Sequence, residues 1–93
     1  MAKENSRTRR PVMLFVTLLS AKGTGNEPLK SLKKLKAPAG IVVKATHFTF
    51  GRYDAVIIFE ATDPKAAMKF AVSVGSATDH TTETLVAIPA EEL

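Results

Sequence analysis

The sequence predicts a single α+β domain in which a four-stranded antiparallel sheet carries two helices on one face. Segments typical of strands and helices follow one another in the order β-α-β-β-α-β. Two of the strand segments, Val12–Leu19 and Ala55–Phe59, are apolar on both alternating faces, which is typical of strands covered on both sides. The chain has 93 residues and no cysteine, so we expect one small domain without a disulfide.

The first half of the chain contains a tail, a strand and a helix. Residues 1–10 show no periodic apolar pattern and contain four basic groups, which predicts a mobile tail in front of a domain over residues 11–93. The first strand is the run Val12–Leu19. A helix is predicted from an N-cap to Lys36, because Pro28 fits its first turn and apolar residues recur at steps of three. These residues are Asn26 at the cap and Leu29, Leu32 and Leu35 in the stripe.

The second half contains a hairpin, a helix and a closing strand. Residues 41–50 and 53–61 are rich in β-branched and aromatic side chains, and the Gly51-Arg52 pair between them predicts a tight turn. Asp63 followed by Pro64 predicts a helix start, and Gly75 predicts its end. The closing strand is predicted over residues 79–88, where polar and apolar side chains alternate.

The predicted order of elements is that of the ferredoxin-like βαββαβ sandwich. Right-handed crossovers place both helices on the same face of the sheet. The first and third strands then lie in its centre, and the second and fourth strands lie at its edges. The sequence agrees with this arrangement, because the central strands are the doubly apolar ones and the edge strands carry Lys, His, Thr and Glu.

The doubly apolar strands also predict a partner. Two helices cover one face of the sheet, so the other face would leave a large apolar patch in water, which monomers rarely do. A second copy packed sheet to sheet would bury this patch, and we expect a homodimer or a higher oligomer of such dimers. The alternative is a monomer whose apolar groove binds a ligand.

Composition excludes several classes of protein. The longest uninterrupted apolar runs have five residues, whereas a membrane helix needs about 20. The opening residues lack a hydrophobic signal core, so we expect a cytoplasmic protein. Net charge is +4, with +7 on residues 1–36 and −3 on residues 37–93. We interpret the positive charge as a property of the tail and of one helix face, and nucleic acid as an unlikely partner, because the third strand lacks an aromatic RNA-binding motif.

The hairpin resembles that of the GYD domain family. The family takes its name from Gly-Tyr-Asp residues, which Gly51, Tyr53 and Asp54 match, and the closing Thr82–Leu85 run, Thr-Glu-Thr-Leu, is a second match. The resemblance covers about residues 12–92. It implies a small ferredoxin-like protein akin to the dimeric α/β-barrel superfamily, and it implies no particular activity. The basic N-terminal extension departs from the family pattern.

The residues around the hairpin turn are the first candidates for a ligand site. Asp54 has the chemistry to act as an acid or base or to bind an amine, and Arg52 has the chemistry to hold an anion. The alternative is structural: Asp54 accepts hydrogen bonds from turn amides, Tyr53 packs on the rim of the sheet, and Arg52 pairs with Asp54.

Two histidines complete the candidate set. His47 is predicted to share a strand face with Val43, Ala45 and Thr49, and His80 to share one with Thr82 and Thr84. If both faces pointed into one cavity, the two imidazoles together with Glu60 or Glu83 could hold a metal. No spacing requires this, so we expect neither a metal nor a cofactor.

Three functions are therefore compatible with the sequence. The first is a homo-oligomeric ligand-binding, sensor or accessory protein of the GYD type. The second is a dimeric α/β-barrel type of enzyme with an intersheet active site, and the third is a nucleic-acid-associated protein that uses the basic tail. The ligand-binding candidates are His47, Arg52, Tyr53, Asp54, His80 and Glu83.

Overall fold

The structure is a computed structural model that describes residues 12–22 and 27–93. The predicted basic tail, the Asn26 cap and the side chain of Leu29 lie outside the part that it describes. The element order is the predicted one, closed by a short 3-10 turn. The elements are β1 Met13–Ala21, α2 Glu27–Lys33, β2 Ile41–Phe48, β3 Ala55–Ala61, α3 Pro64–Thr78, β4 His80–Ala87 and η1 Ala90–Glu92.

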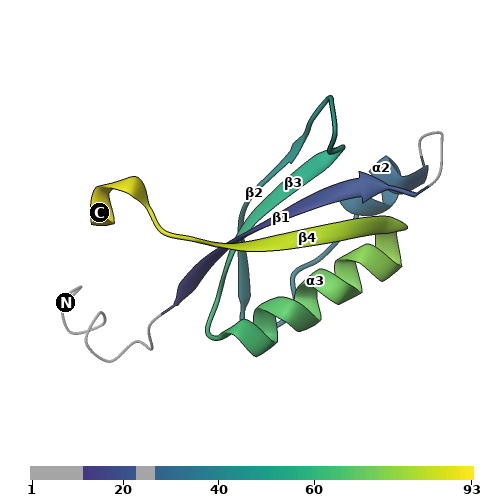
Figure 1. Cartoon of the computed structure of the whole chain (residues 1–93). Coiled ribbons are helices and arrows are strands. Elements are labelled where there is room, and N and C mark those ends of the chain that lie inside the picture. The colour runs from purple at the N-terminus through teal and green to yellow at the C-terminus, as the bar shows by residue number, and fades with distance from the viewer. Residues whose placement is uncertain (1–11, 23–26) are drawn as a thin grey trace.

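The four strands form one antiparallel sheet in the order β2-β3-β1-β4. The prediction that the two doubly apolar strands are central is therefore confirmed. Both helices pack on one face of the sheet and contact each other there (Figure 1). The α+β class and the ferredoxin-like arrangement are thus confirmed as well. No helix in residues 12–22 and 27–93 combines the length and the apolar character needed to cross a membrane.

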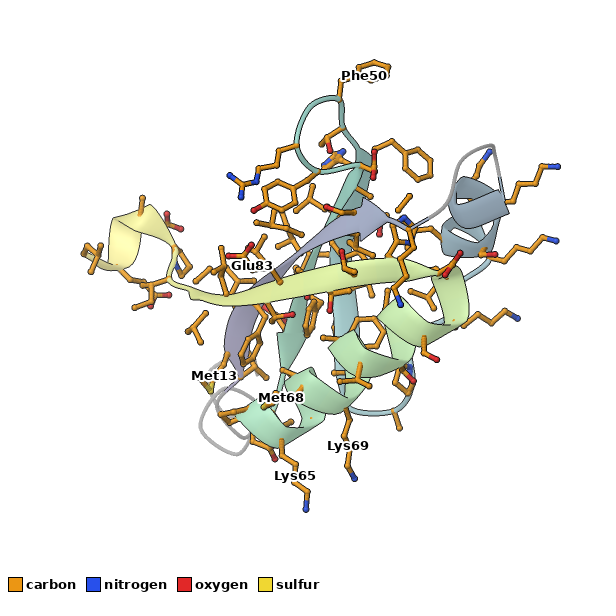
Figure 2. The ribbon with its side chains drawn as sticks, turned by 45° about the vertical axis from the view of Figure 1, so that its right-hand side comes forward. Met13, Phe50, Lys65, Met68, Lys69 and Glu83 are labelled. Atoms are coloured by element: carbon orange, nitrogen blue, oxygen red, sulfur yellow. The ribbon has the colours of Figure 1, made fainter. Side chains whose placement is uncertain are left out.

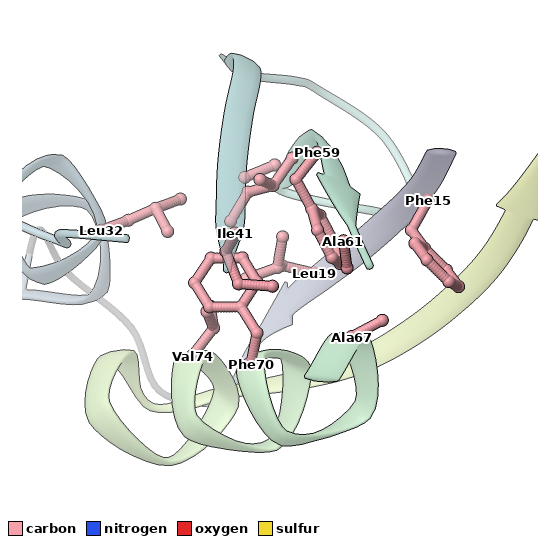
Figure 3. Close-up of a cluster of buried hydrophobic side chains, with 11 residues drawn as sticks. Phe15, Leu19, Leu32, Ile41, Phe59, Ala61, Ala67, Phe70 and Val74 are labelled. Carbon is pink, nitrogen blue, oxygen red and sulfur yellow. The ribbon is translucent and has the colours of Figure 1, made fainter. Parts of the chain in front are cut away.

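The core lies between the sheet and α3 (Figure 3). Phe59 on β3 is at its centre and is fully buried. Its ring stacks on that of Phe15 with centroids 5.6 Å apart, and it meets the ring of Phe70 edge-on at 4.9 Å. Leu32 extends the core to α2. The predicted leucine stripe is borne out at Leu32, which is buried, and at Leu35, which packs against the core from just beyond the end of the helix.

Helix α3 begins as predicted and ends later than predicted. The Oδ1 atom of Asp63 accepts a hydrogen bond from the N–H of Ala66 at 2.8 Å, and Pro64 occupies the first turn. Gly75 was predicted to stop the helix, but it lies buried within it. A Cβ atom there would be 3.0 Å from the carbonyl oxygen of His80, so a side chain at this position would crowd β4 where it packs against the helix. The helix ends at Thr78, and its C-cap residue Asp79 adopts the left-handed conformation with φ of 60°.

Strand β2 contains a β-bulge that the sequence did not indicate. Val43 pairs with Phe59, whereas Ala45 pairs with Ile58, so Lys44 is an extra residue. Because side chains alternate along a strand, one extra residue moves all later ones to the opposite face. The prediction that His47 shares a face with Val43 is therefore wrong.

Candidate functional site

The sheet face opposite the helices is named the open face. Its side chains lie in three rows that cross all four strands, as the register of the strands defines. The middle row is entirely apolar, and the outer rows include His47, Glu60 and Glu83. From β2 to β4 the rows are Val42, Glu60, Leu14 and Ala87; Ala45, Ile58, Val16 and Leu85; and His47, Val56, Leu18 and Glu83.

A polar pair closes one end of the open face. The hydroxyl of Tyr53, in the loop before β3, donates a hydrogen bond of 2.9 Å to Oε1 of Glu83 on β4. Strand β1 lies between the two elements, and Leu18 of β1 is the register partner of both Glu83 and Val56. The tyrosine side chain thus joins segments 30 residues apart in the sequence, across an apolar strip of sheet.

The pair sets the protonation of the tyrosine. The hydrogen bond to the Glu83 carboxylate raises the pKa of Tyr53 above its ordinary value of 10.0, and the negative charge of Glu83 acts in the same direction. The nearby Arg52 opposes this rise in pKa. Tyr53 is therefore a neutral hydrogen-bond donor near pH 7, and Glu83 is its acceptor.

Asp54 holds the loop against the end of β1. Its Oδ2 atom accepts a hydrogen bond of 2.6 Å from the N–H of Ala21, and its own N–H donates to the carbonyl oxygen of Leu19 at 2.7 Å. The carbonyl oxygen of Asp54 accepts from the N–H of Thr49 at 2.9 Å. Gly51 provides the turn with a φ of 123°, a conformation that favours glycine. These contacts give Asp54 a structural role, but the amide that donates to its carboxylate lies at the end of β1 and not in the turn, where the structural alternative expected it. They also position Tyr53.

Arg52 lies beside the tyrosine. Its guanidinium carbon is 5.9 Å from the centroid of the Tyr53 ring, within the range of a cation–π contact. A hollow of about 290 Å³ opens next to this pair. Its walls combine the aromatic and basic loop residues with apolar side chains of the sheet, namely Leu18, Thr49, Phe50, Arg52, Tyr53, Ala55 and Val56.

The two histidines lie on opposite faces of the sheet. His47 is exposed at the β2 edge of the open face, opposite Val56. His80 is 2 % exposed and lies at the start of β4, within hydrogen-bonding distance of Thr78. The Thr78 hydroxyl donates to the carbonyl oxygen of Val74 at 2.6 Å, so Nδ1 of His80 is the donor in their 2.8 Å contact. This arrangement identifies His80 as a structural link between α3 and β4.

The structure thus brings together only some of the residues that were predicted to bind a ligand. Arg52, Tyr53 and Glu83 meet at one end of the open face, and His47 shares a row with Glu83 three strands away, roughly 14 Å at the usual strand spacing. His80 is separated from them by the sheet. Within residues 12–22 and 27–93, no three His, Asp or Glu side chains are grouped in a way that could hold a metal ion.

Sequence reasoning missed the apolar half of this region. Leu18 and Val56 line the hollow beside Tyr53, but in the sequence they are ordinary members of two strand segments. The register between β1, β3 and β4 is what places them next to Glu83. The alternation of side chains along each strand does predict that Leu18 and Val56 lie on the open face. The sequence does not show which residues of different strands are neighbours there, because that depends on the register.

The comparisons with known proteins agree with the geometry of the hairpin. A protein-family model described as the GYD domain matches residues 17–93. The match includes the loop that carries Gly51, Tyr53 and Asp54, and it includes Glu83 on the closing strand. No curated protein matches the chain. Because the family model matches most of its length, the chain belongs to the GYD domain family.

Proposed function

We propose that this protein is a homo-oligomeric small-ligand-binding protein in which two copies pack open face to open face. The observation that carries the proposal is the apolar middle row of the open face. Val16 and Ile58 remain partly exposed in the single chain, and Leu85 is 45 % exposed. Full burial of side chains of this kind contributes roughly 1.5–3 kcal/mol each, which is considerable for a chain of 93 residues.

A ligand site follows from the same packing. A second sheet over the open face would close the hollow beside Tyr53 and remove it from water. The Tyr53 hydroxyl donates to one oxygen of Glu83, so the other carboxylate oxygen can accept a hydrogen bond from a ligand. Leu18 and Val56 would contact its apolar body. We therefore infer a small ligand with an apolar body and an N–H or O–H group.

Sedimentation velocity tests the assembly. We expect the unmodified chain to sediment as a dimer or a multiple of one, and Ile58→Asp to halve the number of subunits, because a charge in the middle row would be buried without a partner. The matched control is Ala77→Asp, which places the same charge on an exposed helix position. A wild-type protein that sediments as a single 10.0 kDa chain at micromolar concentration would overturn the proposal.

Native mass spectrometry of protein purified from its own cell tests the ligand. We expect a mass above that of an integer number of bare chains, and we expect the excess to be lost in Glu83→Gln. A control substitution, Glu91→Gln, changes a carboxylate in the exposed 3-10 turn and should keep the excess. A mass equal to that of bare chains would contradict the ligand-binding part of the proposal and leave the assembly as the remaining function.

A further inference from the structure

A second pocket lies on the helix face of the sheet, between β2 and the segment that leads from α2 to β2. It has a volume of about 370 Å³, which is within the range of small-molecule sites. The buried side chains of Leu32 and Ile57 line it, and so does Phe48, which is 47 % exposed. The pocket therefore reaches from the core to the solvent. Among the described residues, it has no lining residue in common with the hollow beside Tyr53.

The pocket is present because α2 leaves the β2 edge of the sheet partly uncovered. Helix α2 has seven residues and packs mainly against α3 rather than against the strands. Beyond the helix, the N–H of Leu35 donates to the carbonyl oxygen of Leu32, and the N–H of Ile41 donates to that of Pro38. These turns lead the chain directly into β2. The side chains in the second half of β2 consequently lack a covering helix and remain exposed.

The bulge at Lys44 determines which side chains of β2 line the pocket. Beyond the bulge, Thr46 and Phe48 lie on the helix face and form part of the lining. Without the extra residue, Ala45 and His47 would lie on that face instead. Bulges commonly redirect side chains next to functional sites. Here the bulge gives the pocket a hydroxyl group and an aromatic ring in place of a methyl group and an imidazole.

The surroundings of the pocket are uniformly basic. Residues 28–53 contain five lysines and one arginine and neither Asp nor Glu. Lys33 lines the pocket. Lys34, Lys36 and Lys44 are exposed and directly adjoin lining residues in the chain. A cleft surrounded by charge of one sign concentrates ligands of the opposite sign, so the charge pattern favours an anion.

We propose that this pocket binds a monocarboxylate with an apolar body. Lys33 is the single charged side chain among the described residues that line it, and Thr46 supplies a hydroxyl donor. One ammonium and one hydroxyl match the two oxygens of one carboxylate. Recognition of a doubly charged phosphate commonly uses the fork of an arginine, which this lining lacks among its described residues. The apolar body contacts Leu35, Val43 and Phe48.

Octanoate and its neutral isostere octanamide are the probes that test the proposal. Because the pocket is open to solvent, titration followed by NMR is suited to a ligand that would be lost during purification. We expect octanoate to shift the backbone amide signals of residues 32–37 and 43–48, and octanamide to bind more weakly at the same place. Octanoate shifts confined to the open face or to the surface between α3 and β4 would overturn the proposal.

Removal of the lining charge tests the role of Lys33. Lys33→Gln should weaken octanoate binding about threefold to fivefold, as for other exposed ion pairs, and should leave octanamide binding unchanged. The matched control is Lys65→Gln, which removes the same charge from a lysine that projects from α3 away from α2 (Figure 2). It should keep the preference for octanoate. If Lys33→Gln keeps that preference as well, the proposal is wrong.

A steric block tests the location of the site without changing charge. Ala37 lines the pocket, whereas Ala39 does not, and both are exposed in the same segment. Ala37→Phe should fill the pocket and prevent the binding of both probes, and Ala39→Phe should bind them as the wild type does. Because both positions are exposed, we expect both variants to fold. Equal binding by the two variants would contradict the proposed location.

Two variants of the open face separate this pocket from the site beside Tyr53. A ligand there needs an N–H or O–H group for Glu83, whereas the pocket between α2 and β2 needs a negative charge. Ile58→Asp and Glu83→Gln should therefore leave octanoate binding unchanged, whatever they do to assembly or to the other ligand. If Glu83→Gln removed octanoate binding, the acid would bind at the open face and the present proposal would be wrong.

Discussion

The two faces of the sheet are formed by the same strands but differ in burial. On the helix face, Leu19 and Phe59 are fully buried beneath α3. On the open face, Val16 and Ile58, which are also apolar, stay partly exposed. The difference does not lie in the composition of β1 and β3, which are apolar on both sides. It lies in the number of covering layers, because two helices cover only one face of a four-stranded sheet.

The comparison indicates that the helix face stabilises the single chain and that the open face is available for association. Substitutions on the helix face should lower the free energy of unfolding whatever the oligomeric state. Substitutions on the open face should act chiefly on association and on the hollow beside Tyr53. An open-face variant that lowers the free energy of unfolding as much as a helix-face variant would show that the two faces are coupled. Three variants, in order of decreasing expected effect, test these roles.

The largest expected effect is at the centre of the helix face. Phe59→Ala should lower the free energy of unfolding by about 3–5 kcal/mol, because it leaves a cavity between the rings of Phe15 and Phe70. Urea unfolding followed by circular dichroism measures it. If the alanine variant does not fold, Phe59→Leu provides a milder version. Ile58→Ala, on the open face, is the comparison, and an equal loss in a monomeric background would contradict the proposed division.

An intermediate effect is expected at the anchor of the hairpin loop. Asp54→Ala removes the carboxylate that accepts the N–H of Ala21, and it should cost roughly 1–3 kcal/mol because hydrogen bonds to charged groups are among the stronger ones. Asp54→Asn keeps an acceptor of the same shape and should cost less. Thermal unfolding of both variants measures the difference. Equal stability of Asp54→Ala and the wild type would mean that the anchor is dispensable.

The smallest expected effect is a change in the pKa of Tyr53, at one end of the open face. Tyr53 is the single tyrosine in a chain without tryptophan, so phenolate absorbance reports this group alone. Glu83→Gln should lower the pKa of Tyr53 toward its ordinary value of 10.0, because the carboxylate that raises it is removed. For the same reason the contribution of Tyr53 to stability is complete below pH 10 and is lost as the pH rises through the folded-state pKa. An unchanged titration in Glu83→Gln would contradict the importance of the pair.

Several features of the site could be predicted because they depend on local sequence. The Asp63-Pro64 helix start and the face shared by Glu83 and Leu85 follow from capping and strand alternation. A turn at Gly51 was also predicted, but the connection is longer than the predicted Gly51-Arg52 pair, because β2 ends at Phe48 and β3 begins at Ala55. The face of His47 could not be predicted, because the bulge at Lys44 has no marker in the sequence. Likewise Gly75 is typical of a helix stop in the sequence, and only the tertiary structure shows that it lies within the helix, close to the His80 backbone of β4.

The sequence by itself determined the order of the elements, the central place of β1 and β3, and the excess of apolar surface on a sheet that two helices cannot cover. These properties follow from periodicity, which acts over a few neighbouring residues. The tertiary structure alone decided that Tyr53 reaches Glu83, that Asp54 holds the end of β1, and that His80 is buried away from His47. Each of these depends on strand register, which is fixed only when distant segments pair and pack together.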